Sequence, residues 1–307
     1  MLKKMASVFD PMGLFAPILI VGKVLLQKMW DRKLGWDDII NDKETLQTWS
    51  VVETGLAEVS LYTVQRLVAL QDEQKVSSHL LCFCNASTVA YAATVYLHQQ
   101  CGERSTCNLI FAKTRIAPVK GMTVPKLELM AVLIGVRCLT FVKDQLKMNI
   151  SSVYLWTDSQ VVIGWINSEK MLPVFVKNSV NEIKNHKEVT TSYVNTKENP
   201  ADVATKGTRA QLLYKDRLWW HGPKWLEQPI ETWITGKKSM GNVSVEAANE
   251  TVDTEESAFT NTDSVKKVFI ELPLSIDYER YSSITKLLRI TAYALRFKDK
   301  ECYSVRC

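Results

Sequence analysis

HLLCFCNAST, at residues 79–88, is the stretch that decides the fold, because it is an apolar β-type run that ends in polar residues. Two further β-type runs follow it, VAYAATVYLH at 89–98 and CNLIFAKTR at 107–115. Only Ala86 to Thr88, at the polar end of this stretch, separate the β-type run HLLCFCN (79–85) from the second run. A connection this short predicts a hairpin of antiparallel strands.

Beyond these runs the sequence alternates between helical and strand patterns. It predicts, in order, a helix at about 125–143 with Pro125 near its first turn, a strand at 153–157, a helix at 159–167, more helix around 174–187, a strand at 190–196 and a helix opening at Asn199-Pro200. Three consecutive strands followed by helix–strand–helix–strand–helix predict an α/β fold, with a mixed five-stranded sheet flanked by helices.

The flanking sequence divides the chain further. We expect a small helical region at 1–75, the α/β domain at 76–210, a Trp-rich extension at 211–238, an acidic flexible linker at 239–266 and a C-terminal helical segment at 267–307. In the first region, helices are predicted at 10–30 and 41–58, with Asp10 as a cap and Pro11 in the first turn.

Composition narrows the class of protein. The 307 residues allow about two domains, and 46% hydrophobic with 23% charged residues is typical of a globular chain rather than a disordered or fibrous one. A net charge of +5 suits a polyanionic partner without demonstrating one.

Cysteines and apolar runs bear on the compartment. Seven cysteines, an odd number without C-x-x-C spacing, favour reduced thiols and an intracellular protein, cytoplasmic by default or nuclear. The apolar run at 14–22 is interrupted by Lys23 and Lys28, so no membrane span is expected, and no targeting segment is visible.

Three acids stand near the ends of the predicted elements, and each has a local explanation. Asp158 lies between a strand and a helix, which is a favoured N-cap position. Asp202 follows Asn199 by three residues and can accept from helix-start amides. Glu128 lies in the first predicted turn of its helix, where a negative charge favours the helix dipole. That helix is apolar almost all round, however, so a carboxylate on it is costly unless it binds a cation.

Taken together, the segments suggest a shared site. Asn85 at the first strand, Glu128 on the following helix, Asp158 at the end of the fourth strand and Asp202 at the last helix are predicted to converge at one rim of the sheet. Hard divalent ions such as Mg²⁺ bind clustered oxygen ligands of this kind. Two such ions about 3.5–4 Å apart can clamp the attacking water and the leaving oxygen of a phosphodiester.

A family resemblance rests on residues spread over most of 7–226. The stretches that carry it are FDPMGLFAP, LGWDD, FAKTRIAPVKGMTVPKLELMAVLIG, WTDSQVVIGWI, NTKENPADVATKG and LWWHGPKWL. They resemble the ribonuclease H region of BEL/Pao-type retrotransposon Pol polyproteins. Residues 1–75 resemble the end of the reverse transcriptase (thumb and connection), and the tail RYSSITKLLRITAYALRF resembles the segment before the integrase.

The resemblance implies a ribonuclease H-like fold and cleavage of the RNA strand of RNA/DNA hybrids with two Mg²⁺ or Mn²⁺ ions. It assigns the metal-binding, catalytic acids to positions 85, 128, 158 and 202, of which Glu128, Asp158 and Asp202 match. The family pattern D-A-S reads Asn85-Ala86-Ser87 here, and its acid bridges both metals. One unit charge at close range, with an effective dielectric near 20, is worth about 4 kcal/mol. We therefore expect an impaired metal site.

Several other residues are candidate nucleic-acid contacts. Lys113, Arg115, Lys120 and Lys126 are predicted near the metal rim, in the loop after the third strand and the following helix start, where they can reach a phosphate backbone or simply form a solvated surface. Ser87 and Ser159, beside the acid positions, are further candidate polar contacts. The Trp-rich stretch can stack on bases, but packing is the favoured interpretation.

Three interpretations of function follow. The first is a Pol fragment descended from a ribonuclease H, with reverse transcriptase and integrase parts as partners and its activity impaired. The second is a non-catalytic nucleic-acid-binding or host-recruited module, kept for its fold and basic face. The third is the translation product of a decaying element with no selected role.

Overall fold

The computed structural model describes residues 1–35, 38–59, 62–64, 76–102, 104–119, 121–228 and 230–233. All of these lie in one compact unit, Met1–Thr251. The predicted linker at 239–266, the predicted C-terminal helical segment at 267–307 and Lys120 fall outside the described residues.

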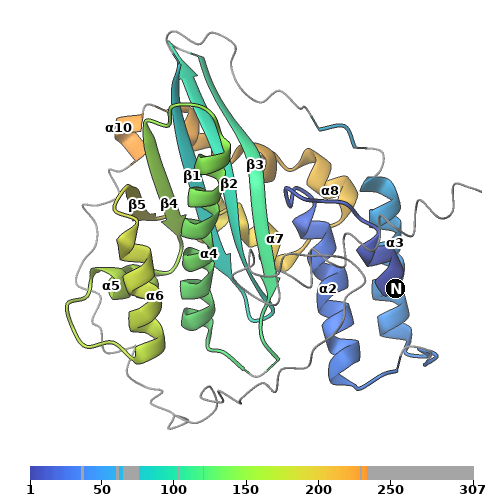
Figure 1. Ribbon diagram of the computed structural model, residues 1–307. Coiled ribbons are helices and arrows are strands. Elements are labelled where there is room, and N and C mark those ends of the chain that lie inside the picture. The colour runs from blue at the N-terminus through green and yellow to red at the C-terminus, as the bar shows by residue number, and fades with distance from the viewer. Residues whose placement is uncertain are drawn as a thin grey trace, which may run out of the picture. The chain divides into compact units, whose positions relative to one another are not determined.

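A five-stranded sheet forms the centre of the unit (Figure 1). Its strands are β1 (Ser77–Ala86), β2 (Ala90–Cys101), β3 (Arg104–Ile116), β4 (Ser152–Thr157) and β5 (Val189–Tyr193), in the spatial order β3-β2-β1-β4-β5. The first three strands pair antiparallel, whereas β4 runs parallel to both β1 and β5. The predicted mixed sheet and its opening hairpin are confirmed.

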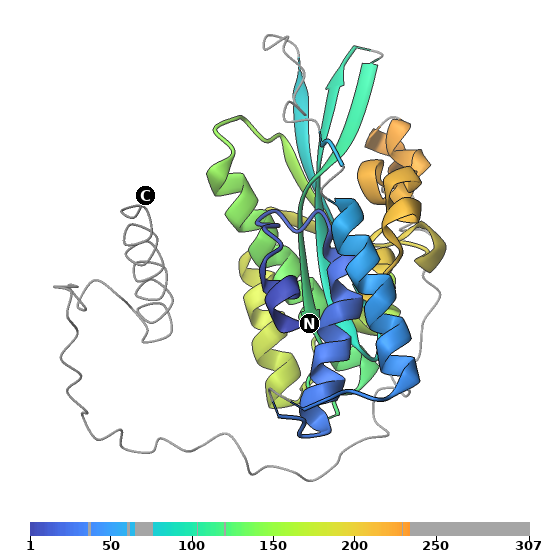
Figure 2. The same cartoon turned by 90° about the vertical axis from the view of Figure 1, so that its right-hand side faces the viewer.

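Helices flank the sheet on both faces (Figures 1 and 2). The α-helices are α1 (Leu2–Ala6), α2 (Ala16–Asp31), α3 (Lys43–Val59), α4 (Val124–Gln145), α5 (Gln160–Asn167), α6 (Val174–Asn185), α7 (Ala201–Lys206), α8 (Ala210–Lys215), α9 (Arg217–His221) and α10 (Ile230–Trp233). Short 3-10 turns η1 (Thr196–Glu198) and η2 (Lys224–Glu227) accompany them. No helix in these described ranges has the length and apolar character of a bilayer-spanning segment.

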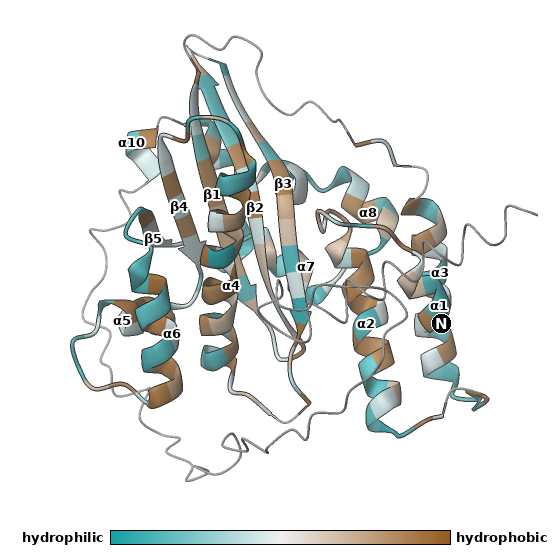
Figure 3. Cartoon of the chain, in the orientation of Figure 1, coloured by the Kyte–Doolittle hydropathy of each residue, from teal (hydrophilic) through white to brown (hydrophobic). Residues whose placement is uncertain are grey.

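One face of the sheet packs against α4. Leu80, Cys82 and Cys84 alternate along β1 toward this face, where they share a buried core with Val132 and Leu139 of α4. Because α4 is apolar around most of its circumference, it is covered by the sheet on one side and by α5 and α6 on the other. Figure 3 shows the apolar residues (brown) along the strands and α4.

The opposite face carries the tryptophans. Phe83 of β1 stacks on Trp156 of β4 at a ring-centroid distance of 5.1 Å. Trp219, Trp225 and Trp233 belong to the apolar cluster on this face. Because Trp219 and Trp233 are buried, the packing interpretation of the Trp-rich stretch is confirmed for them.

The start of α2 differs from the sequence prediction. The helix begins at Ala16 with Pro17, not Pro11, in its first turn. Asp10 precedes the helix, and its two carboxylate oxygens accept from the backbone N–H groups of Leu14 and Phe15, both at 2.9 Å. The DPMG segment is therefore a tight turn ahead of the helix rather than part of it.

This turn fastens the N-terminal helices to the sheet. The backbone N–H of Ala112, on the edge strand β3, donates to the carbonyl of Met12 at 2.8 Å. Gly13 has φ +72°, and a Cβ at this position would lie 2.0 Å from the Ala112 carbonyl oxygen. Both the backbone conformation and the close approach to β3 therefore require glycine here.

We expect Gly13→Ala to lower the free energy of unfolding by about 1–3 kcal/mol, since it places a side chain at positive φ and against β3. Urea denaturation followed by circular dichroism measures the change. Gly164→Ala is the matched control: Gly164 is exposed within α5 and has open space at its Cβ position. Alanine there should leave the protein unchanged or raise its stability by up to about 1 kcal/mol. Equal effects of the two substitutions would contradict the role of Gly13.

Candidate functional site

Sheet register brings two of the four predicted positions together. The parallel pairing of β1 and β4 aligns Cys84 with Thr157. The next residues in the sequence are Asn85 in β1 and Asp158 just after β4. Both therefore lie where the carboxyl ends of these parallel strands meet, which we call the edge of the sheet. The Asn85 amide Nδ2 donates to Asp202 Oδ1 of α7 at 2.8 Å, which adds a third position.

Glu128 reaches this edge from α4. Its Oε2 accepts a hydrogen bond of 2.6 Å from the Ser159 hydroxyl. The same hydroxyl accepts from the backbone N–H of Val162 at 3.2 Å and so caps the start of α5. Since Ser159 follows Asp158 directly, Glu128 lies beside Asp158. The four predicted positions therefore lie together, while their role as metal ligands stays a prediction.

The local explanations for the three acids are wrong. Ser159, not Asp158, is the N-cap of α5. At the start of α7, the backbone N–H of Ala201 donates to Asn199 Oδ1, whereas the Asp202 carboxylate contacts Asn85 and Lys206 instead. Because α4 already begins at Val124, Glu128 stands beyond its first turn, where the helix dipole is weaker. None of the acids therefore serves the local helix-terminal role that its sequence position suggested.

Burial raises the energy of the negative charge at this edge. It raises the pKa of Glu128; the nearby Asp158 charge raises that pKa further and the Ser159 hydrogen bond lowers it. Burial likewise raises the pKa of Asp158, with the Asp202 charge adding to it and hydrogen bonds from Thr196 and Asn199 opposing it. Asp158 Oδ1 is buried and has no hydrogen-bond partner within the described ranges. A cation between Glu128 and Asp158 would relieve this cost.

The negative charge of Asp202, in contrast, is compensated by N–H donors. Asn85 Nδ2 donates to Asp202 Oδ1 and also to Thr205 Oγ1 at 3.3 Å, and Lys206 Nζ lies 2.8 Å from Asp202 Oδ2. Both Asp202 oxygens are thus engaged. In the part of the chain that the structure describes, no group of three or more Asp, Glu, His or Cys side chains is placed to hold a metal. The residues therefore fit a divalent ion only in part, through Glu128 and Asp158.

Asn199 is a residue of this edge that the site prediction missed. Its side chain is fully buried at 0% exposure, and its Nδ2 donates to the Cys84 carbonyl at 3.0 Å. Its Oδ1 accepts from the Ala201 backbone N–H at 3.1 Å. The signal in the sequence was the Asn-Pro pair at a helix start, which indicates a cap but not a contact with β1.

The predicted nucleic-acid contacts are distributed around the same edge. Lys113 and Arg115 lie exposed on β3 itself and not in the loop after it, which corrects their expected placement. Lys126 is half-buried in the first turn of α4. The Ser87 hydroxyl accepts from the backbone N–H groups of Val89 and Ala90 in the β1–β2 turn, at 3.3 and 3.2 Å. Binding of nucleic acid by these residues remains a prediction.

The strand order, with three antiparallel strands followed by two parallel ones, and the flanking helices define a ribonuclease H-like domain. The family described as Pao retrotransposon-like RNaseH-like domain matches residues 1–159, more than half of the chain. The chain belongs to this family, and the predicted resemblance is confirmed.

Solved structures similar to the chain include three kinds of protein. The N-terminal RNase H domain of a Mycobacterium tuberculosis protein is 10% identical, with 45% of this chain and 98% of that chain covered and a TM-score of 0.31. LC11-RNase H1, isolated from compost and solved with an RNA/DNA hybrid, is 13% identical, with 45% and 99% covered and a TM-score of 0.30.

The third is a foamy viral protease-reverse transcriptase solved with double-stranded DNA, which is 12% identical, with 56% of this chain and 30% of that chain covered and a TM-score of 0.30. No curated protein matches the chain.

We expect Asn199→Ala to lower the free energy of unfolding by about 1–3 kcal/mol, because it leaves the buried Cys84 carbonyl and the start of α7 without their partner. Chemical denaturation measures the loss. Asn195→Ala is the control on the same segment, since Asn195 is exposed and only caps η1. A loss no larger than that of the control would show that the contact between α7 and β1 is unimportant.

We also expect Asp158→Asn to stabilise the protein at pH 7 by about 1 kcal/mol. The folded-state pKa of Asp158 is raised, so folding favours the protonated acid and the charged form lowers stability above that pKa. The gain should vanish as the pH falls below about 4, the ordinary range of an aspartate pKa. Urea titrations between pH 3.5 and 8 test it, with exposed Asp144→Asn as control. A pH-independent gain would contradict the charge argument.

Proposed function

We propose that the chain is a fragment of a retrotransposon Pol polyprotein, and that its ribonuclease H-like domain descends from a two-metal endonuclease for the RNA strand of RNA/DNA hybrids. We further propose that Asn85 has impaired that activity. The observation that carries the proposal is the pairing of Asn85, at the end of β1, with Asp202 at 2.8 Å, with Asp158 at the end of the adjacent strand β4 and Glu128 near Asp158.

Charge is the first reason to expect impairment. An aspartate at position 85 would add one negative charge beside Asp202 and Asp158, and a divalent ion there would gain about 4 kcal/mol per unit charge at an effective dielectric near 20. Each 1.4 kcal/mol lost from transition-state stabilisation slows a reaction about tenfold. A difference of about 4 kcal/mol therefore corresponds to roughly three orders of magnitude in rate, and a third of it to about tenfold.

Hydrogen-bond direction is the second reason. Asn85 presents N–H donors to Asp202 and Thr205, whereas a metal ligand must present an oxygen. Turning the amide over would offer its carbonyl oxygen to a metal but would break both hydrogen bonds. In this orientation the Asn85 amide disfavours the divalent ion that an aspartate would attract.

Glu128 and Asp158 would hold the remaining divalent ion, Mg²⁺ or Mn²⁺. When bound, such an ion supplies an activated water and a counter-charge for a phosphodiester. The chain itself contributes the orientation of Glu128 through Ser159, and the placement of Asp158 at the end of β4. Sequence-independent phosphate contacts are assigned to Lys113, Arg115 and Lys126, with Lys120 as a further candidate by sequence alone.

The family match supports the proposed polyprotein context. The match at 1–159 runs without a break from the N-terminal helices into the sheet, so those helices belong to the family pattern. We infer that reverse transcriptase and integrase parts are natural partners of this segment, and that it acts inside the cell, where the described cysteines remain free thiols.

A second function, non-catalytic binding of nucleic acid, is favoured by one observation. The contacts of Asp202 with Asn85 and Lys206 close half of the site without a metal ion. A domain retained only for binding would keep its fold and basic face and lose its dependence on divalent ions. Recruitment by a host would take this form.

We expect Asn85→Asp to raise cleavage of an RNA/DNA hybrid in 5 mM Mg²⁺ or Mn²⁺ by at least tenfold, because it would restore a negative charge at the position that the family resemblance assigns to a metal-binding acid. The measurement is the initial rate on a labelled 20-base-pair hybrid, with double-stranded DNA as the substrate control. Asn85→Asp combined with Glu128→Gln is the matched control and should return the rate to background.

Metal binding gives a readout independent of activity. Mn²⁺ should raise the midpoint of thermal unfolding more for Asn85→Asp than for the unaltered chain, since a ligand that binds only the folded state stabilises it. Strong cleavage by the unaltered chain would overturn the claim of impairment. Inactivity of Asn85→Asp together with no metal-induced stabilisation would instead favour the binding module.

A further inference from the structure

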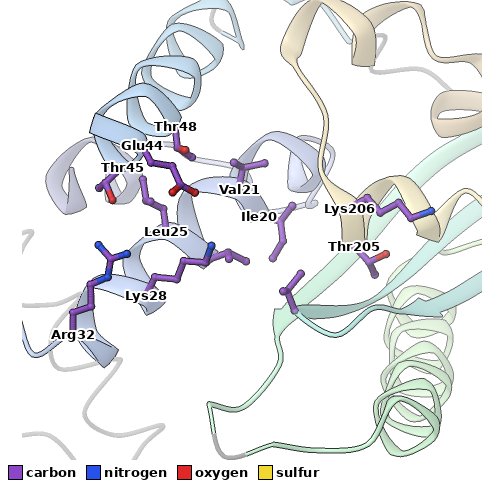
Figure 4. Close-up of a pocket in the computed structure, with 12 residues that line it drawn as sticks. Ile20, Val21, Leu25, Lys28, Arg32, Glu44, Thr45, Thr48, Thr205 and Lys206 are labelled. Carbon is purple, nitrogen blue, oxygen red and sulfur yellow. The ribbon is translucent and has the colours of Figure 1, made fainter. Parts of the chain in front are cut away.

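A cleft opens beside the candidate site, between the N-terminal helices and α7 (Figure 4). It has a volume of about 190 Å³ and is lined by side chains of α2, α3, α7 and the β1–β2 turn. None of the residues assigned to metal binding or phosphate contact above lines it.

The cleft is continuous with the candidate site through α7. Thr205, which lines the cleft, accepts the hydrogen bond from Asn85 Nδ2 at 3.3 Å. Lys206, its neighbour, pairs with Asp202. Val89, on the turn that Ser87 supports, lines the cleft as well. Thr205 and Lys206 of α7 therefore border both the cleft and the candidate site.

The chemistry of the lining suits a sugar–phosphate backbone. Three cationic side chains, Lys28, Arg32 and Lys206, face one carboxylate, Glu44. Arg32 makes an exposed ion pair with Asp42 at 3.4 Å, and Lys206 is held by Asp202, whereas Lys28 makes no ion pair with any residue in the described ranges. Exposed ion pairs of this kind contribute little free energy, so Lys28 and Arg32 are both available to an anion.

Spacing along α2 agrees with this chemistry. Lys28 lies in the last turn of α2 and Arg32 is its C-cap residue, whose backbone N–H donates to the Lys28 carbonyl, so the two are one helical turn apart, about 6 Å along the axis. Two phosphate steps of one strand span about 7 Å of a duplex axis. Apolar residues such as Val24 and Leu25 line the same cleft and offer a surface to the sugar rather than a polar code for bases.

We propose that the cleft between α2, α3 and α7 binds the sugar–phosphate backbone of the nucleic-acid strand that crosses the candidate site, with Lys28 and Arg32 contacting its phosphates. The proposal rests on the proposed function in one respect, namely that the chain binds nucleic acid. It extends the contact surface from the sheet edge onto the N-terminal helices. Contacts of this type fix the position of a strand without reading its sequence.

The test measures binding of a fluorescent 20-base-pair RNA/DNA hybrid to the full chain by anisotropy, without divalent ions, between 50 and 300 mM salt. Lys28→Glu with Arg32→Glu should weaken binding at least tenfold. Lys28→Gln with Arg32→Gln should lower the slope of log affinity against log salt by about 2, since each phosphate contact contributes about 0.9. The glutamine pair keeps the test decisive if the charge-reversed pair fails to fold, which circular dichroism reports.

Lys184→Glu with Lys187→Glu is the matched control. Both lysines are exposed at the end of α6, next to the start of β5, and β5 pairs there with the beginning of β4. They thus stand at the sheet edge opposite Asp158, and their reversal should weaken binding no more than twofold to threefold.

The possible outcomes distinguish failure of the cleft proposal from failure of the proposed function. Equal loss in the α2 and control pairs would overturn the cleft while leaving the proposed function intact. No binding by the unaltered chain at 50 mM salt would overturn both. Competition by 5 mM inorganic phosphate beyond that of sodium chloride at equal ionic strength would assign the cleft to a free anion, and so overturn its role in strand binding.

Discussion

The buried contact between β1 and α7 is the constraint on which the rest of the site depends. Asn199 joins the two elements by donating to the Cys84 carbonyl and accepting from Ala201, with no exposure to solvent. An unpaired polar group in such a place costs about 1–3 kcal/mol, so α7 has one preferred position on the sheet. That position sets Asp202 beside Asn85 and Thr205 beside the cleft.

The acids at the edge of the sheet differ in how their negative charge is compensated. Burial raises the pKa of both Glu128 and Asp158, and nearby carboxylates raise both pKa values further, so negative charge is costly at these two side chains. Around Asp202, N–H donors from Asn85 and Lys206 already compensate the negative charge. The amide at position 85 thus gives Asp202 a hydrogen-bond donor where the family resemblance leads us to expect a metal-binding acid.

The N-terminal helices are built into the same unit as the sheet. The turn at Asp10–Phe15 pairs with β3, Ile18 of α2 shares the apolar cluster of the tryptophans, and the Thr208 N–H donates to the Pro17 carbonyl at 3.0 Å. Since α2 is thereby fixed against both β3 and the end of α7, Lys28 and Arg32 have a defined place in the cleft that Thr205 and Lys206 also line. The cleft exists only because of this docking.

The sequence by itself determined the elements and the identity of the acids, because strand and helix periods and the family stretches are local features. The five strands and the long helix at α4 could be predicted, whereas the roles given to positions 85, 128, 158 and 202 stay a prediction. Only the tertiary structure decided which groups cap which helices and that Asn199 crosses to β1. These depend on contacts between residues as far as 117 positions apart, such as Asn85 and Asp202, and no local pattern encodes their geometry.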